Sequence, residues 1–473
     1  MFLLKKISIT ENQKAIVWSF VEKSSSFAVN FVLQIVLARL LAPDAFAVLA
    51  MLAIFASVSQ VFIDGGFATV LIQKQDCTYK DYNTVFIFNV LISLIVYVLF
   101  YFLAPVIEKY YEFSDLAKVT RIYFLWLVIN AISMINRLLL IKTLQFRKLA
   151  QINTLATLFS SVPTIILAYY GYGYWALVCQ NLVSTSFMTI GYLISYRWIP
   201  SLRFSFSSLK GLLPFGVRMF FVDLIYAIYN NIYSLLIGKY YKPSELGYYD
   251  RGKFLGSMGP IGFSDFFMRA LYPIQSRIQH DEDLELSYNR AFRCCALFIV
   301  PISVFVSIFS VETISFLYGQ KWVEAASFTA IMSLGFMLYP LHSLNITMLK
   351  VKASGSYLLR SEVCKKVIGI CIALLLIRYK LYILILGWLF SACFDFVISE
   401  IYLYKRYSFS LSTSLKDLFS IFSVSLVIAA CLKYTISFFI PNITLKFLLS
   451  GVIYCLFYFI VFRKRFYQVV FNR

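Results

Sequence analysis

Long apolar segments recur along almost the whole chain and are separated by short polar stretches. A helix needs about 20 apolar residues to cross a bilayer, and only helices and closed barrels satisfy their backbone hydrogen bonds there. The eleventh and twelfth segments are separated only by the region around Arg378 and Lys380. The pattern predicts fourteen membrane-spanning helices, at residues 15–41, 45–70, 82–107, 117–140, 150–170, 174–196, 213–238, 245–270, 291–317, 323–349, 355–377, 381–404, 416–439 and 445–462.

The composition agrees with an all-α polytopic membrane protein. Of the 473 residues, 60% are hydrophobic and 14% are charged, whereas soluble domains have about 45–50% apolar and about 25% charged residues. The nine cysteines form no CxxC spacing, so we expect neither a disulfide framework nor a metal site. The first residues lack an apolar stretch followed by a small-residue cleavage site, and we expect no removable signal peptide.

The basic residues are distributed unevenly between the two sides of the predicted bundle. If both termini are cytoplasmic, the cytoplasmic segments hold well over half of the 43 Lys and Arg. In this assignment Lys365 and Lys366 belong to the cytoplasmic side. Such a bias is the positive-inside pattern of membrane proteins. It explains the net charge of +20 without a nucleic-acid partner.

Two stretches of the chain match each other at an offset of 200 residues. Residues 37–46 align with residues 237–246, and each reads as a helix end, a basic residue, a proline and the start of a new helix. We therefore expect a parallel repeat of two helix bundles. The predicted organisation is an N-lobe at 1–196, a cytoplasmic linker at 197–212, a C-lobe at 213–404, and two further helices with a basic tail at 405–473.

Several of these motifs resemble one known family. They are Leu37-Ala38-Arg39-Leu40-Leu41-Ala42-Pro43, Phe62-Ile63-Asp64-Gly65-Gly66, Leu71-Ile72-Gln73, Leu246-Gly247-Tyr248-Tyr249-Asp250-Arg251 and Tyr318-Gly319-Gln320-Lys321-Trp322. Over residues 15–350 the chain is similar to bacterial polysaccharide flippases of the multidrug/oligosaccharidyl-lipid/polysaccharide exporter superfamily. It departs from them at Ala45-Phe46-Ala47, where the family usually carries Phe-Gly after the aspartate.

The resemblance implies a fold, a substrate and a location. It implies two pseudo-symmetric six-helix lobes in a V, with two added C-terminal helices. It also implies alternating access for an undecaprenyl-diphosphate-linked oligosaccharide, used in lipopolysaccharide, capsule or exopolysaccharide synthesis at the bacterial inner membrane. The expected partners are this lipid-linked substrate, membrane lipids, a polysaccharide polymerase and a chain-length regulator, with no cofactor and no enzymatic activity.

Other functions remain as alternatives. A multidrug or small-molecule exporter of the same superfamily would favour an acid-rich cavity. A membrane polymerase or glycosyltransferase would usually carry a long external loop, and none is predicted. Asp281-Glu282-Asp283 fits a loose metal-binding pattern of glycosyltransferases, but we interpret it as a solvated acidic run in a loop. His342 is interpreted as a hydrogen-bonded packing residue rather than a proton relay, and the tyrosines around Gly171 as an interfacial belt rather than a sugar-stacking surface.

Charged residues inside the predicted spans are the candidate functional residues, because charge in a bilayer is costly and usually lines a cavity. Arg and Lys suit the two negative charges of a diphosphate. The substrate-binding candidates are Lys23, Arg218, Arg251 and Lys253. The coupling or gating candidates are Glu22, Asp64, Asp223, Asp250, Asp265 and Asp395.

Two pairings are expected among these residues. Residues 250 and 253 share a helix face, so Asp250 is expected to neutralise Lys253 and to leave Arg251 for a diphosphate. The repeat offset places Lys23 opposite Asp223, and we hypothesise that they pair in one access state. The alternatives are independent partners, such as Glu22 for Lys23, and basic side chains that only extend to the membrane interface.

Overall fold

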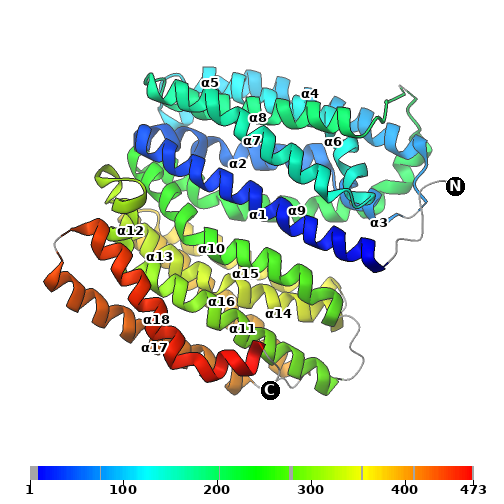
Figure 1. Ribbon diagram of the computed structural model, residues 1–473. Coiled ribbons are helices and arrows are strands. Elements are labelled where there is room, and N and C mark those ends of the chain that lie inside the picture. The colour runs from blue at the N-terminus through cyan, green and yellow to red at the C-terminus, as the bar shows by residue number, and fades with distance from the viewer. Residues whose placement is uncertain are drawn as a thin grey trace. The chain divides into compact units, whose positions relative to one another are not determined.

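The computed structural model contains helices and no strand in the residues it describes, which are 9–74, 76–201, 203–275, 281–352, 355–407, 411–440 and 442–470 (Figure 1). The chain divides into two compact units, Met1–Leu246 and Gly247–Arg473. We call them unit 1 and unit 2. The predicted boundaries of the two lobes stay a prediction.

Unit 1 holds nine helices and the beginning of a tenth among its described residues. They are α1 (Ile9–Leu40), α2 (Pro43–Asp64), α3 (Phe67–Gln73), α4 (Tyr79–Tyr111), α5 (Leu116–Tyr123), α6 (Leu125–Lys142), α7 (Phe146–Tyr169), α8 (Tyr174–Ser195), α9 (Phe206–Tyr240) and the first turn of α10 (Pro243–Gln275). Helices α7 and α8 pack on each other and α7 packs on α1, while α9 packs on α2, α3 and α4.

Unit 2 contains the rest of α10 and the following helices. They are α11 (Asp281–Ile308), α12 (Ser310–Leu317), the short η1 (Gln320–Trp322), α13 (Ala325–Met337), α14 (Tyr339–Lys352), α15 (Gly355–Leu376), α16 (Leu381–Tyr407), α17 (Leu411–Phe439) and α18 (Ile443–Val470). A core of buried apolar side chains joins α11, α14, α16, α17 and α18.

Eleven helical stretches of the described residues are long and apolar enough to cross a membrane. They correspond to eleven of the fourteen predicted spans. The other three predicted spans, 15–41, 245–270 and 355–377, are also helical, as α1, α10 and α15. Charged residues in α10 and α15 lower the mean hydropathy of these helices. They are therefore not among the eleven stretches that are apolar enough to cross a membrane. The count of fourteen spans stays a prediction.

Four predicted single helices are each broken into two in the structure. The helix expected at 45–70 is α2 and α3, the one at 117–140 is α5 and α6, the one at 291–317 is α11 and α12, and the one at 323–349 includes α13 and α14. Only the first break contains glycines. The loop predicted around Asp281 is also shorter than expected, because α10 continues to Gln275 and α11 begins at Asp281.

The repeat detected in the sequence coincides with equivalent helix boundaries. Helix α1 ends at Leu40 and α2 begins at Pro43, and 200 residues later α9 ends at Tyr240 and α10 begins at Pro243. Proline is well suited to the first helical position, because its missing N–H has no partner there in any helix. The predicted end-and-restart of the helix is confirmed in both stretches.

The break between α2 and α3 depends on two glycines in the left-handed region of backbone space. Gly65 has φ +51° and Gly66 has φ +71°. A Cβ atom on Gly66 would overlap the carbonyl oxygen of Gly216 in α9. The glycine pair therefore both turns the chain and allows α9 to approach it closely.

We expect Gly66→Ala to destabilise unit 1, with a lower melting temperature and a lower yield of the detergent-solubilised protein. The left-handed backbone costs an alanine about 1–2 kcal/mol, and the overlap with Gly216 adds about 1–3 kcal/mol. Gly171→Ala is the matched control, because Gly171 has φ +81° but no atom within 4 Å of the position that a Cβ would take. Equal losses from both variants would contradict the close contact with α9.

We call residues 196–205, between α8 and α9, the connector. Buried polar side chains of unit 1 form hydrogen bonds with it. The Asn83 side chain exchanges two hydrogen bonds with Ser201, at 2.6 Å and 3.0 Å. The Ser205 N–H donates to the Thr84 hydroxyl at 3.1 Å, and the Asn136 side chain donates to the Tyr196 carbonyl at 2.7 Å. These hydrogen bonds hold the described residues of the connector to unit 1.

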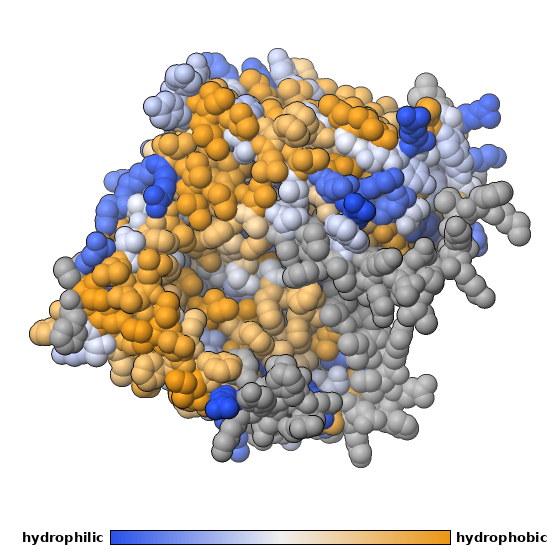
Figure 2. Space-filling model, viewed as in Figure 1, coloured by the Kyte–Doolittle hydropathy of each residue, from blue (hydrophilic) through white to orange (hydrophobic). Residues whose placement is uncertain are grey.

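The outer helices present mostly apolar side chains. Figure 2 shows hydrophobic residues gathered over the outer helices of unit 1, and separately over α17 and α18 of unit 2. Large exposed apolar side chains are numerous on α4, α8, α17 and α18. In a soluble monomer such areas are unusual, and here they are what lipid-facing helices require.

Candidate functional site

Arg251, on the third turn of α10, lies in the interior of unit 2 with only 8% of its surface exposed. Its Nη2 and Nε atoms lie 2.6 Å and 3.1 Å from the same carboxylate oxygen of Asp250. The guanidinium also lies over the ring of Phe254, 5.1 Å from its centre. The residue is held by charge and by stacking.

The expectation that Asp250 leaves Arg251 without a carboxylate partner is wrong. Side chains of neighbouring helix positions do not face each other, but the long arginine side chain reaches back to the carboxylate before it. The Lys253 ammonium lies 5.9 Å from the ring centre of Tyr249, one turn earlier. Whether these basic side chains bind substrate stays a prediction.

Three other predicted residues lie outside the described side chains. These are Glu22, Lys23 and Arg218. The proposed pair of Lys23 with Asp223 therefore stays a hypothesis. Of the acidic candidates, Asp223 and Asp265 are exposed on their helices. The side chains of Asp281, Glu282 and Asp283 are also outside the described part, although their backbone begins α11 instead of forming a loop.

Asp64 ends α2 beside a short polar chain inside unit 1. Gln60 donates to its carboxylate at 2.8 Å, and Asn130 of α6 donates to the Gln60 carbonyl at 3.2 Å. Asp64 also lies within electrostatic range of Arg137 and Asp223. The structure therefore brings two of the predicted acidic residues, Asp64 and Asp223, into one region of unit 1.

A buried polar network connects three helices of unit 2. The Asn345 amide of α14 donates to the Ser399 hydroxyl and to the Glu400 carboxylate of α16, both at 2.9 Å. The Tyr288 hydroxyl of α11 lies 2.8 Å from both the Glu400 carboxylate and the Asn345 carbonyl. All four side chains are at most 3% exposed.

The network continues to α15 through His342. The Nδ1 atom of His342 lies 3.3 Å from the Ser399 hydroxyl, and its Nε2 atom lies 3.7 Å from the Glu362 carboxylate. Lys365 donates to the same carboxylate at 2.8 Å. The sequence-based interpretation of His342 as a hydrogen-bonded residue agrees with these contacts.

A second buried ion pair lies beside the network. Lys366 donates to Asp395 at 3.2 Å, and both side chains are about one-tenth exposed (12% and 10%). Lys365 lies in α15 and not in a loop, and its side chain is 4% exposed within the helix bundle; its assignment to the cytoplasmic side stays a prediction. The spacing of Glu362, Lys365 and Lys366 at i, i+3 and i+4 places all three on one helix face. This spacing could have indicated from the sequence that α15 carries a buried charged face.

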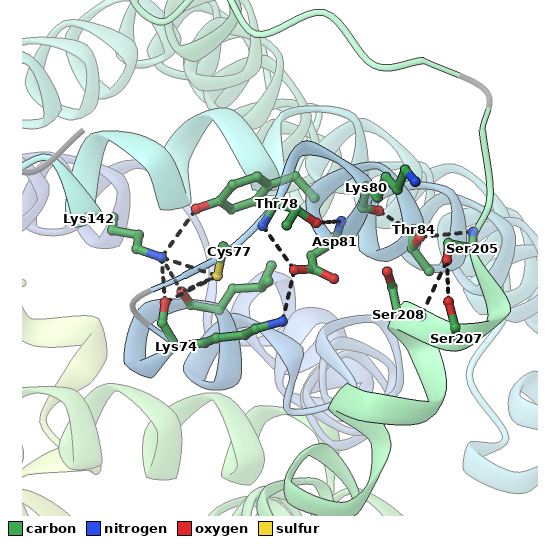
Figure 3. Close-up of polar contacts among 12 residues, drawn as sticks. Lys74, Cys77, Thr78, Lys80, Asp81, Thr84, Lys142, Ser205, Ser207 and Ser208 are labelled. Carbon is green, nitrogen blue, oxygen red and sulfur yellow. Dashed lines mark hydrogen bonds and ion pairs between the residues drawn. The ribbon is translucent and has the colours of Figure 1, made fainter. Parts of the chain in front are cut away.

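Unit 1 holds a polar cluster where α3, α4 and α9 meet (Figure 3). Asp81 accepts from the Lys74 ammonium at 2.9 Å and from the Thr78 N–H at 3.0 Å, which completes a capping box at the start of α4. Ser205 caps α9 by accepting from the Ser208 N–H at 3.3 Å. A cavity of about 630 Å³ lies here, lined by Val70, Lys74, Thr78, Asp81, Ser207, Ser208, Gly211 and Leu212.

Lys142, at the end of α6, closes the other side of this cluster (Figure 3). Its ammonium donates to the carbonyls of Leu71 and Lys74 at 2.9 Å and 2.8 Å. It also lies 3.2 Å from both the Cys77 sulfur and the Tyr82 hydroxyl. Lys142 thus caps the last turn of α3, where carbonyl groups lack helical partners, and it holds the turn that leads into α4.

A family model described as "Polysaccharide biosynthesis protein" matches residues 36–327. The chain is 24% identical to the teichuronic acid biosynthesis protein TuaB of Bacillus subtilis (strain 168), over 62% of each chain. It is 23% identical to the lipopolysaccharide biosynthesis protein WzxC of Escherichia coli (strain K12), over 64% of this chain and 63% of WzxC. It is 22% identical to the succinoglycan biosynthesis transport protein ExoT of Rhizobium meliloti (strain 1021), over 65% and 63%. The matches thus span less than two thirds of the length of these relatives.

Solved structures share the fold over more of the chain. The lipid II flippase MurJ, in an inward closed conformation, is similar with a TM-score of 0.73 at 16% identity, covering 96% of this chain and all of MurJ. An inward-facing multidrug resistance transporter of the MATE family, from the MOP superfamily, has a TM-score of 0.59 at 16% identity and covers 82% and 98%. At these identities the likeness shows the fold alone.

Proposed function

Since the chain belongs to the polysaccharide biosynthesis protein family, as its motifs predicted, we propose that it translocates undecaprenyl-diphosphate-linked oligosaccharide units across the bacterial inner membrane. It does so by alternating access and catalyses no covalent reaction. The observation that carries the proposal is the match of a polysaccharide biosynthesis family to a chain that is itself a helical membrane bundle. Such a protein acts on an intermediate that is held in the membrane.

The chemistry of the interior supports this substrate. An oligosaccharide diphosphate cannot enter hydrocarbon without replacing its hydration, so the protein has to supply polar groups and cations. Arg251 is a buried arginine with a guanidinium suited to phosphate oxygens, and Lys253 lies on the same helix. We propose that these residues, with Lys23 and Arg218, bind the diphosphate. Glu22, Asp64, Asp223, Asp250, Asp265 and Asp395 are proposed to serve gating or coupling.

The main alternative is export of a small molecule. The MATE structure shares the fold over less of the chain than MurJ does, and the basic candidates suit an anionic cargo better than an organic cation. A polymerase or chain-length regulator acting with this protein remains part of the proposal. The relative named a succinoglycan biosynthesis transport protein supports transport within such a system.

Reconstituted transport tests the function. Proteoliposomes with a fluorescent undecaprenyl-diphosphate oligosaccharide should lose its protection from a membrane-impermeant quencher faster than protein-free vesicles. A cationic dye loaded into the same vesicles serves as the competing cargo. Efflux of the dye without movement of the lipid-linked sugar would overturn the proposal in favour of a multidrug exporter.

We also propose that both termini face the cytoplasm, and we expect single cysteines at positions 207 and 442 to be labelled from opposite sides. Ser207 is exposed at the start of α9, and Asn442 is exposed before α18. The variants are made in a background without the nine native cysteines, and labelling uses a membrane-impermeant maleimide. Position 442 should react in intact cells, and position 207 only after permeabilisation. Reaction of both positions from outside would contradict the fourteen-span topology.

A further inference from the structure

In the polar network of unit 2, acceptors outnumber the hydrogens available for donation at two contacts. The network runs from Tyr288 through Asn345, Glu400 and Ser399 to His342 and Glu362. Each side chain has a fixed number of hydrogens to donate. Because the groups are buried or, for His342, mostly shielded, each missing hydrogen leaves two acceptors facing each other at a free-energy cost.

The first place is around Glu400. The amide of Asn345 uses both of its hydrogens, one toward Ser399 and one toward Glu400. The single hydrogen of the Tyr288 hydroxyl faces two acceptors at 2.8 Å, the Asn345 carbonyl and the Glu400 carboxylate. If Glu400 is protonated, it donates to the Tyr288 oxygen while Tyr288 donates to Asn345. One added proton satisfies every contact.

The second place is between His342 and Glu362. The Ser399 hydroxyl donates to the Phe396 carbonyl at 2.7 Å, so its oxygen accepts from the Nδ1–H of His342. In a neutral ring the other nitrogen, Nε2, then carries a lone pair, and it faces the Glu362 carboxylate at 3.7 Å. A proton on Nε2 converts this opposition into an ion pair between α14 and α15.

We infer that this network is a proton-binding site of unit 2, with one proton held on Glu400 and a second entering between His342 and Glu362. Each proton comes from water, adds to a lone pair on the carboxylate oxygen or on Nε2, and returns to water. Its use to drive transport rests on the function proposed above. Protonation of His342 then strengthens the contact of α14 with α15, and release weakens it.

Charged groups on the packed helices set the field around the site. Lys365 of α15 already neutralises Glu362, and Lys366 neutralises Asp395 of α16. Asp265 of α10 interacts electrostatically with Tyr339 at the start of α14. On α11, Glu285 lies one turn before Tyr288, and Arg293 pairs with Asp417 of α17. Helix α13 has no ionisable side chain. Among the described side chains of the network, Glu400 and Nε2 of His342 are therefore the positions that we propose take protons.

The test uses the full chain reconstituted in lipid without any substrate, so its outcome does not depend on flipping. Infrared difference spectra between acid and alkaline buffer should show the carbonyl stretch of a neutral carboxylic acid in the wild type. Glu400→Gln should remove that band, and Asp417→Asn, the matched carboxylate-to-amide control, should keep it. A proton-uptake measurement with a pH indicator should give one proton fewer for His342→Gln. Persistence of the band in Glu400→Gln, or unchanged proton uptake in His342→Gln, overturns the site.

A second measurement tests the coupling. Flipping by the wild type should follow the pH gradient, because the ratio of the protonated to the deprotonated form of a site changes about tenfold per pH unit. The double variant of Glu400→Gln with His342→Gln removes both proton positions, so it should flip at a rate that no longer depends on pH. If the wild type flips equally with and without a gradient, the proton site is not coupled to transport, while the proposed function stands. If the infrared and proton-uptake results hold but no flipping occurs, the proposed function fails and the proton site stands.

Discussion

Arg251→Ala is expected to abolish export of the lipid-linked oligosaccharide. The substitution removes the buried guanidinium that we propose binds the diphosphate, and it leaves the Asp250 carboxylate without its partner at 2.6 Å. Breaking a buried ion pair in this way destabilises a protein by about 3 kcal/mol or more. Arg251→Lys should retain partial export, because the charge remains and the planar geometry does not. Export is measured as polysaccharide on the cell surface, normalised to the amount of protein in the membrane.

A double variant separates lost binding from lost stability. Asp250→Asn with Arg251→Ala removes the orphaned charge, so the protein should accumulate normally and still fail to export, and Asp250→Asn alone measures the part of the loss that belongs to the carboxylate. Arg121→Ala is the control, since Arg121 also stacks on an aromatic ring, 4.6 Å from the centre of Tyr101, but forms no ion pair within the described part of the chain. It should export normally. Full export by the double variant would show that Arg251 serves only its neighbour.

Lys365→Met should cause a severe loss of stability. Lys365 and Glu362 are three residues apart on α15, and their charged groups are 2.8 Å apart and almost fully buried. Removing the lysine leaves a carboxylate in the bundle interior, which costs about 3–5 kcal/mol. We expect a lower melting temperature of the detergent-solubilised protein, measured by the fluorescence of its six tryptophans.

The chain offers a matched control for this change. Lys118 and Asp115 are also three residues apart in sequence, with their charged groups 2.8 Å apart, but their side chains are 73% and 46% exposed. Lys118→Met should leave the melting temperature unchanged, because exposed ion pairs contribute little. If the two variants had the same melting temperature, the burial of the Lys365 pair would be contradicted.

The positions of the helices were accessible from sequence because apolar length is a strong signal. The helix boundaries at Pro43 and Pro243 followed from the missing N–H of proline. The breaks at Phe309 and Leu338 were missed, since neither residue is a glycine or a proline and each break is defined by packing. The break at Gly65 and Gly66 was missed although its sequence signal, two adjacent glycines, was present.

The partners of the charged residues were less accessible. The spacing of Asp250 and Lys253 was correct for one helix face, yet the arginine between them formed the ion pair. Which pair forms depends on side-chain rotamers and on the ring of Phe254, and neither is encoded in spacing. The network around Glu400 joins residues more than one hundred positions apart, such as Tyr288 and Glu400. No local pattern reports such a contact.

The connector limits where this protein can be divided without loss of buried hydrogen bonds. The predicted boundary between the two repeats lies between α8 and α9, yet the hydrogen bonds of Asn83, Thr84 and Asn136 to the connector form only when that segment is present. A chain cut after α8 would leave the buried Asn83 and Asn136 amides without these partners, which costs free energy. A cut that keeps the hydrogen bonds of unit 1 therefore has to fall after the connector.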